Sequence, residues 1–142
     1  MNRYLVIANQ TLGADQLYDK VRACLAAGAC TFHIVVPATP PTDNLTWVEE
    51  EAWAIAHERL DRALVWFSEL GAEVDGEVGD ANPLLAISDA LRGNEFDHII
   101  LSTLPAGISR WLKMDLPSRV DATFGLPVSH IVSEPDRREA GS

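Results

Sequence analysis

Residues 98–124 read HIILSTLPAGISRWLKMDLPSRVDATF, and this stretch decides the fold of the chain. Its apolar start, His98–Leu101, predicts a fully buried strand that stops at Ser102 and Thr103. A loop containing proline and glycine comes next. A helix is expected to begin at Asp115, because aspartate is a favoured N-cap and proline is tolerated in the first turn. Strand, loop and helix N-terminus in this order build the ligand crevice of an open α/β sheet.

Buried strands and amphipathic helices alternate on both sides of this stretch. Strands are expected at 3–8, 31–36, 72–78 and 127–132, and helices at 14–27, 46–70, 82–92 and 115–124. Strands that are separated by helices pair in parallel through right-handed crossovers, so the chain is predicted to be a single doubly wound, Rossmann-like α/β domain. This domain is expected at residues 1–132, and the polar residues 133–142 are expected to form a disordered tail.

Two of these elements carry more detailed expectations. The helix at 46–70 begins with Thr46 and Glu49, which fit a capping box, and Gly71 ends it. Its apolar stripe, at spacings of three and four, is predicted to consist of Trp53, Ala56, Leu60, Ala63, Phe67 and Leu70. The strand at 72–78 is expected at a sheet edge, because its valines alternate with charged residues.

The composition excludes several classes of function. The chain has 142 residues, 11 lysines and arginines and a formal net charge of −10, which argues against nucleic acid as a partner, since such proteins need a basic patch. No apolar run approaches the roughly 20 residues of a membrane span. A strand is expected directly after Met1-Asn2, so no signal peptide is expected and the protein is expected to be cytoplasmic. Cys24 and Cys30 match no paired motif and are expected to be free thiols.

Several short motifs resemble the universal stress protein (UspA-like) family over nearly the whole chain, from Tyr4 to Val132. These motifs are Gly79-Asp80, Asp97–Leu101, Gly107–Arg110, Arg119-Val120 and Leu126–Val128. The resemblance implies the adenine nucleotide α-hydrolase-like fold, with a five-stranded parallel sheet in the order 3-2-1-4-5 and a domain that is often dimeric. Some members of the family bind ATP and others do not.

The ATP-binding members of that family carry G-x-x-G, nine further residues and then G-[ST], whose glycines let the backbone approach the phosphates. Aligned on Gly107–Arg110, the motif positions of this chain fall on Leu101, Leu104, Met114 and Asp115. A carboxylate at a helix N-terminus would repel a triphosphate by on the order of 1 kcal/mol or more, and Arg110 and Lys113 would offset part of this. ATP or AMP is therefore disfavoured, and no other cofactor is expected.

The residues expected to line the crevice lie at the carboxyl ends of the first, second and fourth strands and in the loop that follows: Asn9, Val36, Leu101, Ser102, Thr103, Gly107, Arg110 and Asp115. The hydroxyls of Ser102 and Thr103 are expected to bond either a ligand or the backbone of the turn. Asn9 falls where the family carries an aspartate on the adenosine side, and it is expected to contact a ligand or to form an Asx turn. Asp115 is expected to be a carboxylate that repels phosphate or simply a helix cap.

The sequence contains no G-x-S-x-G elbow, no P-loop and no G-x-G-x-x-G. His57, His98 and His130 show no metal-ligand spacing, and His33 is expected to be a satisfied or edge-facing strand residue rather than a ligand. The leading interpretation is a small-ligand-binding or regulatory domain without catalytic activity of its own. The alternatives are a nucleotide-binding enzyme of the adenine nucleotide α-hydrolase-like superfamily and a purely structural interaction protein.

The last expected strand, residues 127–132, carries no Lys, Arg, Asp or Glu, and the strand order that the resemblance implies places it at a sheet edge. An unpaired edge is either blunted or paired, so a homodimer through this strand is expected, with its two-fold axis near His130. Apart from this second copy, a small molecule is the only kind of partner that the sequence indicates.

Overall fold

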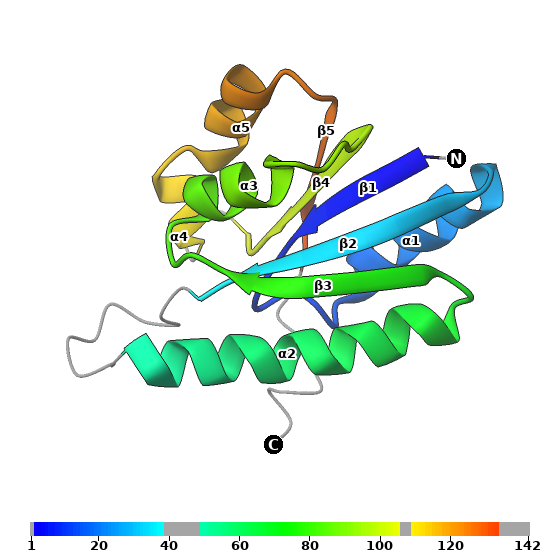
Figure 1. Ribbon diagram of the computed structural model, residues 1–142, viewed down its shortest axis with the longest axis horizontal. Coiled ribbons are helices and arrows are strands. Elements are labelled where there is room, and N and C mark those ends of the chain that lie inside the picture. The colour runs from blue at the N-terminus through cyan, green and yellow to red at the C-terminus, as the bar shows by residue number, and fades with distance from the viewer. Residues whose placement is uncertain (1, 39–48, 106–108, 134–142) are drawn as a thin grey trace.

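The computed structural model describes residues 2–38, 49–105 and 109–133, which form a three-layer α/β/α domain (Figure 1). Its elements, in chain order, are β1 (Asn2–Ile7), α1 (Asp15–Ala27), β2 (Cys30–Pro37), α2 (Glu49–Glu69), β3 (Glu73–Gly79), α3 (Pro83–Leu91), β4 (His98–Thr103), α4 (Arg110–Lys113), α5 (Leu116–Phe124) and β5 (Val128–Val132). All predicted strands and helices are present. The short helix α4 is additional, and the sequence does not predict it.

The five strands form one parallel sheet in the order β3-β2-β1-β4-β5, which confirms the doubly wound fold. β1 lies at the centre, where Leu5 pairs with His33 of β2 on one side and with Ile99 of β4 on the other. The chain order reverses between β1 and β4, and open α/β sheets hold their ligands outside the carboxyl ends of the strands at such a point. β3 and β5 are the two edges, as predicted.

The helices cover the sheet in two groups (Figure 1). α1 and α2 pack on one face over a cluster that includes Leu17 and Val6, whereas α3 and α5 pack on the other over a cluster that includes Ile87 and Leu5. Successive side chains of a strand point to opposite faces, so Leu5 and Val6 enter different clusters. A central strand is therefore buried on both sides, which explains the near-continuous apolar runs in the sequence.

The buried stripe of α2 differs from the prediction at its first position. Ala52 is buried and begins the stripe that continues through Ala56 and Leu60, whereas Trp53 is 51% exposed and packs against the ring of His57. One residue is a rotation of 100° on a helix, so Trp53 lies beside the stripe rather than in it. The predicted capping residue Thr46 lies outside the described residues. No helix in the described ranges is both long enough and apolar enough to cross a membrane.

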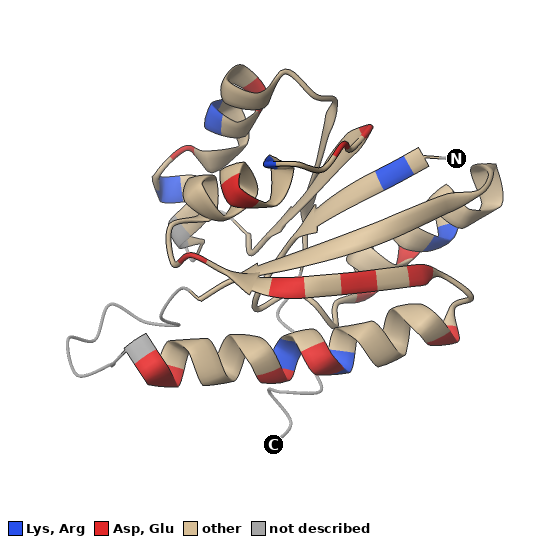
Figure 2. Cartoon of the chain, viewed as in Figure 1, with Lys and Arg blue, Asp and Glu red and all other residues tan. Residues whose placement is uncertain are grey.

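Edge strand β3 has two different faces. Its carboxylates, Glu73, Asp75 and Glu77, are spaced along the strand (Figure 2), and Val74 and Val78 alternate with them and pack in the cluster under α2. Gly76 lies between these valines, and a Cβ there would come within 2.6 Å of both Leu60 Cδ1 and the Ile34 carbonyl oxygen. The glycine therefore allows α2 to pack closely on β3.

Candidate functional site

The fold brings most of the predicted crevice residues together at one end of the sheet. Asn9 follows β1, Val36 lies near the end of β2, and Leu101–Thr103 forms the end of β4. Because the strands are parallel, their carboxyl ends meet at the same edge. Val36 and Leu101 are fully buried, so their side chains belong to the core. Gly107 lies outside the described residues. Arg110 is the first residue of α4, and only its backbone is among the described parts of the structure.

Asn9 is held by protein groups at both ends of its side-chain amide. Its Nδ2 donates a hydrogen bond to the Pro37 carbonyl oxygen over 2.8 Å, and its Oδ1 accepts one from Arg59 Nη1 over 2.6 Å. The side chain is buried and therefore ties the end of β1 to the end of β2 and to α2. These bonds are not those of an Asx turn, and the expected ligand contact stays a prediction.

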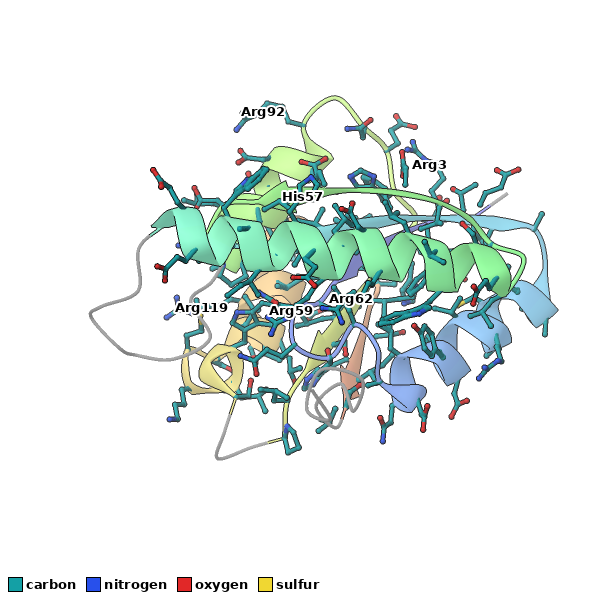
Figure 3. The ribbon with its side chains drawn as sticks, turned by 90° about the horizontal axis from the view of Figure 1, so that it is seen from below. Arg3, His57, Arg59, Arg62, Arg92 and Arg119 are labelled. Carbon is teal, nitrogen blue, oxygen red and sulfur yellow. The ribbon has the colours of Figure 1, made fainter. Side chains whose placement is uncertain are left out.

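Arg59 is a site residue that the sequence analysis missed. It precedes the buried Leu60, so it lies on the flank of the apolar stripe of α2. Arg59 and Arg62 extend from one side of α2, and His57 extends from the other (Figure 3). A long cation at the border of a buried stripe is the sequence signal for such a contact, because its stem can pack while its head reaches a polar group.

Ser102 belongs to a buried chain of three hydroxyls. Its Oγ lies 2.7 Å from Thr11 Oγ1 and 3.1 Å from Ser133 Oγ, and all three side chains are almost wholly buried. The N–H of Ser133 also donates to the Thr103 carbonyl oxygen over 2.8 Å. Ser133 therefore extends the folded domain, although the sequence assigned it to the tail, and β4 reaches two residues beyond its predicted end at Leu101.

Thr103 is bonded to the edge strand. Its Oγ1 lies 2.8 Å from His130 Nε2, and burial lowers the pKa of His130, which favours the neutral imidazole. A neutral Nε2 accepts a hydrogen bond from the threonine hydroxyl when the tautomer places hydrogen on Nδ1. Each hydroxyl of the Ser102–Thr103 pair is thus engaged by other side chains rather than by the backbone of a turn.

Part of the expected loop forms the helix α4, Arg110–Lys113. Trp111 of α4 is buried against the core on the α3 and α5 side, and Ser109 Oγ accepts a hydrogen bond from the N–H of Leu112 over 3.1 Å. A serine hydroxyl that accepts from the backbone N–H three residues later is an N-terminal cap. The anchoring tryptophan and this cap explain how a helix of four residues persists.

Asp115 lies between α4 and α5 with φ 58° and ψ 42°, in the left-handed region. Among the described residues it is the sole non-glycine residue with a positive φ. The predicted capping role of its side chain is wrong, because a capping side chain requires an extended backbone and the Asp115 carboxylate makes no bond to α5. Its backbone serves both helices: the N–H donates to Leu112 and the carbonyl accepts from Arg119.

The remaining candidates have structural roles. His33 is bonded on both ring nitrogens, which confirms that it is a satisfied strand residue. Cys24 and Cys30 are free and buried, and burial raises the pKa of the Cys30 thiol, which makes it less reactive. Within the described parts of the chain, no three His, Cys, Asp or Glu residues are grouped so that they would hold a metal ion.

The sheet order and the position of its switch point define an open, doubly wound α/β domain. The universal stress protein from Archaeoglobus fulgidus has a similar structure, with a TM-score of 0.63 over 92% of this chain and 93% of that chain at 18% sequence identity. No family model matches the chain, and no curated protein matches it in sequence. The likeness therefore lies in the fold, and the site must be interpreted from its own residues.

Proposed function

We propose that the chain is a universal-stress-protein-like regulatory or small-ligand-binding domain whose ATP binding is weak or absent. In this proposal the domain has no catalytic activity of its own and acts in the cytoplasm as a homodimer. The observation that carries it is the double engagement of Asn9 by Pro37 and Arg59. Asn9 follows the central strand at the switch point, where a ligand would need free polar groups.

The buried polar groups next to Asn9 support the same proposal. The Ser102 hydroxyl is bonded to Thr11 and Ser133, and the Thr103 hydroxyl is bonded to His130. A ligand that used these groups would have to break existing bonds, and a buried polar group left unsatisfied costs about 1–3 kcal/mol. The exposed carboxylate of Asp115 at the start of α5 adds a like charge against phosphate.

Two other functions compete with this proposal. An enzyme of the adenine nucleotide α-hydrolase-like superfamily would need a positioned phosphate and a nucleophile, and the Thr103 hydroxyl is buried and bonded. A purely structural interaction protein would have no small ligand at all. Release of phosphate from ATP tests for the enzyme, and a thermal shift with AMP, cyclic AMP and other small metabolites separates a binder from a scaffold.

Calorimetry with Mg-ATP tests the central claim. We expect no saturable heat with the wild-type protein, whereas Asn9→Asp combined with Asp115→Asn should bind more tightly. The first change introduces the carboxylate of the ATP-binding members, and the second removes a like charge with a residue that tolerates the left-handed backbone. A low-micromolar dissociation constant for the wild type would overturn the proposal.

A further inference from the structure

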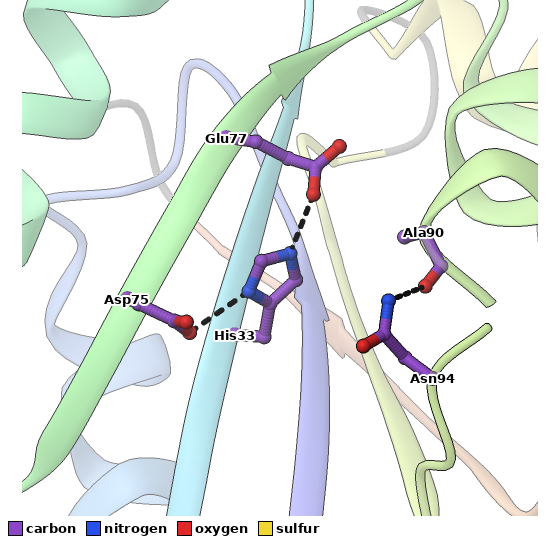
Figure 4. A network of polar contacts seen from close by, with 5 residues as sticks. All are labelled: His33, Asp75, Glu77, Ala90 and Asn94. Atoms are coloured by element: carbon purple, nitrogen blue, oxygen red, sulfur yellow. Dashed lines mark hydrogen bonds and ion pairs between the residues drawn. The ribbon is translucent and has the colours of Figure 1, made fainter. Parts of the chain in front are cut away.

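His33 makes an unusual pair of contacts with the edge strand. Its Nδ1 lies 2.8 Å from Asp75 Oδ1 and its Nε2 lies 2.9 Å from Glu77 Oε2, so one imidazole bridges two carboxylates of β3 (Figure 4). The His33 side chain is 17% exposed, whereas the two carboxylates reach into solvent, at 81% for Asp75 and 47% for Glu77. His33 and Asp75 also pair directly in the β2–β3 register.

The number of protons on the ring decides how many of these contacts are hydrogen bonds. An ionised carboxylate only accepts, and a neutral imidazole carries one N–H, so it can donate to Asp75 or to Glu77 but not to both. Both contacts are hydrogen bonds only in the imidazolium form, in which each nitrogen carries a proton. After loss of one proton, a nitrogen lone pair would face a carboxylate oxygen, and that exposed carboxylate would swing into water.

We propose that His33, Asp75 and Glu77 form a proton-dependent clasp that fastens edge strand β3 to β2. The clasp is complete when His33 carries two protons and loses one of its two bonds as the pH rises. It lies on the face of the sheet opposite to α2, because His33 pairs with Leu5, whose side chain packs in the cluster under α3 and α5, and Asp75 and Glu77 alternate with the valines that face α2. The proposal is independent of the proposed function, since it requires no ligand.

The surroundings of the clasp contain few compensating cations. Other charged side chains on the neighbouring elements are Arg3 on β1, Glu73 on β3, Asp89 on α3, Arg92 at the C-cap of α3, and Glu95 and Asp97 before β4. The Arg3 guanidinium lies 4.8 Å from the ring centroid of Phe96, and Arg92 pairs with Asp89 at 3.3 Å. The ring of Phe96 packs against that of His33 at 5.8 Å. The two basic side chains therefore already have partners, and the imidazolium is the cation that bonds both carboxylates.

Urea unfolding of the full chain at about pH 5.5 and about pH 8 tests the clasp, because histidine titrates between these values. We expect His33→Gln to lower the unfolding midpoint by roughly 0.3 M or more at the lower pH and by clearly less at the higher pH. His57→Gln is the matched control, because His57 contacts a single carboxylate, Asp61 at 3.3 Å, on the exposed side of α2. Its effect should be small at both pH values.

A second variant keeps the test decisive if His33→Gln folds poorly. Asp75→Asn combined with Glu77→Gln changes only exposed side chains, and their amides can donate to a neutral imidazole as well as accept from it. The stability difference between this variant and the wild type should shrink as the pH rises. Equal midpoint losses at both pH values, in His33→Gln or in the double variant, would overturn the proposal.

Discussion

At the scale of single residues, the carboxyl end of the central strand is held by a pair that lies 50 positions apart in the sequence. Arg59 reaches from α2 to the amide oxygen of Asn9, and the other end of that amide holds the end of β2. A hydrogen bond from a charged donor is worth more than one between neutral groups. The pair therefore fixes α2 against the switch point of the sheet and occupies the polar group best placed for a ligand.

Replacing Arg59 with methionine tests how much this pair contributes. Methionine keeps most of the apolar stem but leaves the buried Asn9 oxygen without its donor, so we expect a loss of about 1–3 kcal/mol in the free energy of unfolding. Arg92→Met removes the same charge from an exposed ion pair and should cost at most about 1 kcal/mol. Urea denaturation compares the two. Equal losses in both variants would mean that the Asn9 contact is not stabilising.

Asp115 is the second residue whose role depends on its backbone. The left-handed conformation costs roughly 1–2 kcal/mol for most residues, and a β-branched side chain fits it worst. We therefore expect Asp115→Val to lower the free energy of unfolding by about 1–2 kcal/mol, whereas Asp115→Asn and Asp115→Gly stay near the wild type. Urea denaturation measures all three. A valine variant as stable as the asparagine variant would show that the strain is relieved elsewhere.

At the scale of elements, β5 is attached to β4 by two histidines in addition to the backbone ladder. His98 Nε2 lies 2.7 Å from Ser129 Oγ, and His130 Nε2 lies 2.8 Å from Thr103 Oγ1. Burial lowers the pKa of both histidines, and the positive charge of Lys20 lowers that of His98 further. These two contacts between β4 and β5 are therefore suited to neutral histidines, in contrast to the clasp on β3.

Acid should weaken the contact between His130 and Thr103. Because the pKa of His130 is lower in the folded protein, the unfolded chain binds a proton first as the pH falls. The contribution of His130 to the free energy of unfolding is therefore present above about pH 6.5 and is lost below it. We expect His130→Gln to flatten the decline in the free energy of unfolding between about pH 6.5 and about pH 5. Urea unfolding across this range compares the variant with the wild type. Parallel profiles would show that His130 does not contribute to the decline.

The elements also show which parts of the structure a sequence can specify. The start of α3 follows from local chemistry, because Asn82 Oδ1 accepts from the N–H of Leu84 and Pro83 opens the helix. α4 is four residues long, too short for a periodic signal, and depends on burial of Trp111 against distant strands. The bonds of Asn9 likewise follow from tertiary packing. The strands, the helices and their parallel pairing were predictable from local pattern, the strand order followed from the family resemblance, and the polar partners at the site were not predictable.

At the scale of the whole molecule, the two edges of the sheet differ in charge. β3 carries three carboxylates, which discourage pairing with another chain, whereas β5 carries no Lys, Arg, Asp or Glu (Figure 2). The ladder also shows which groups of β5 face outward. Ile99 donates to the Pro127 carbonyl and Ser133 donates to the Thr103 carbonyl, so odd-numbered residues bond β4 and even-numbered residues present their N–H and C=O groups at the open edge.

The homodimer that we propose would pair this open edge with its own copy around a two-fold axis. Val132 is an outward-facing edge position whose side chain is 49% exposed, and lysine there would bring a charge to the interface without removing a bond to β4. We expect Val132→Lys to shift the dimer toward monomer by roughly tenfold or more in dissociation constant, which is about 1.4 kcal/mol. Val65→Lys is the matched control, because Val65 is also exposed, at 56%, but lies on α2, which packs on β3 at the opposite edge of the sheet from β5. Sedimentation at several protein concentrations measures both variants. A wild type that stays monomeric would remove the proposed interface. A Val132→Lys variant that dimerises as tightly as Val65→Lys would place the interface elsewhere, and the exposed Trp53 on α2 would be the next position to test.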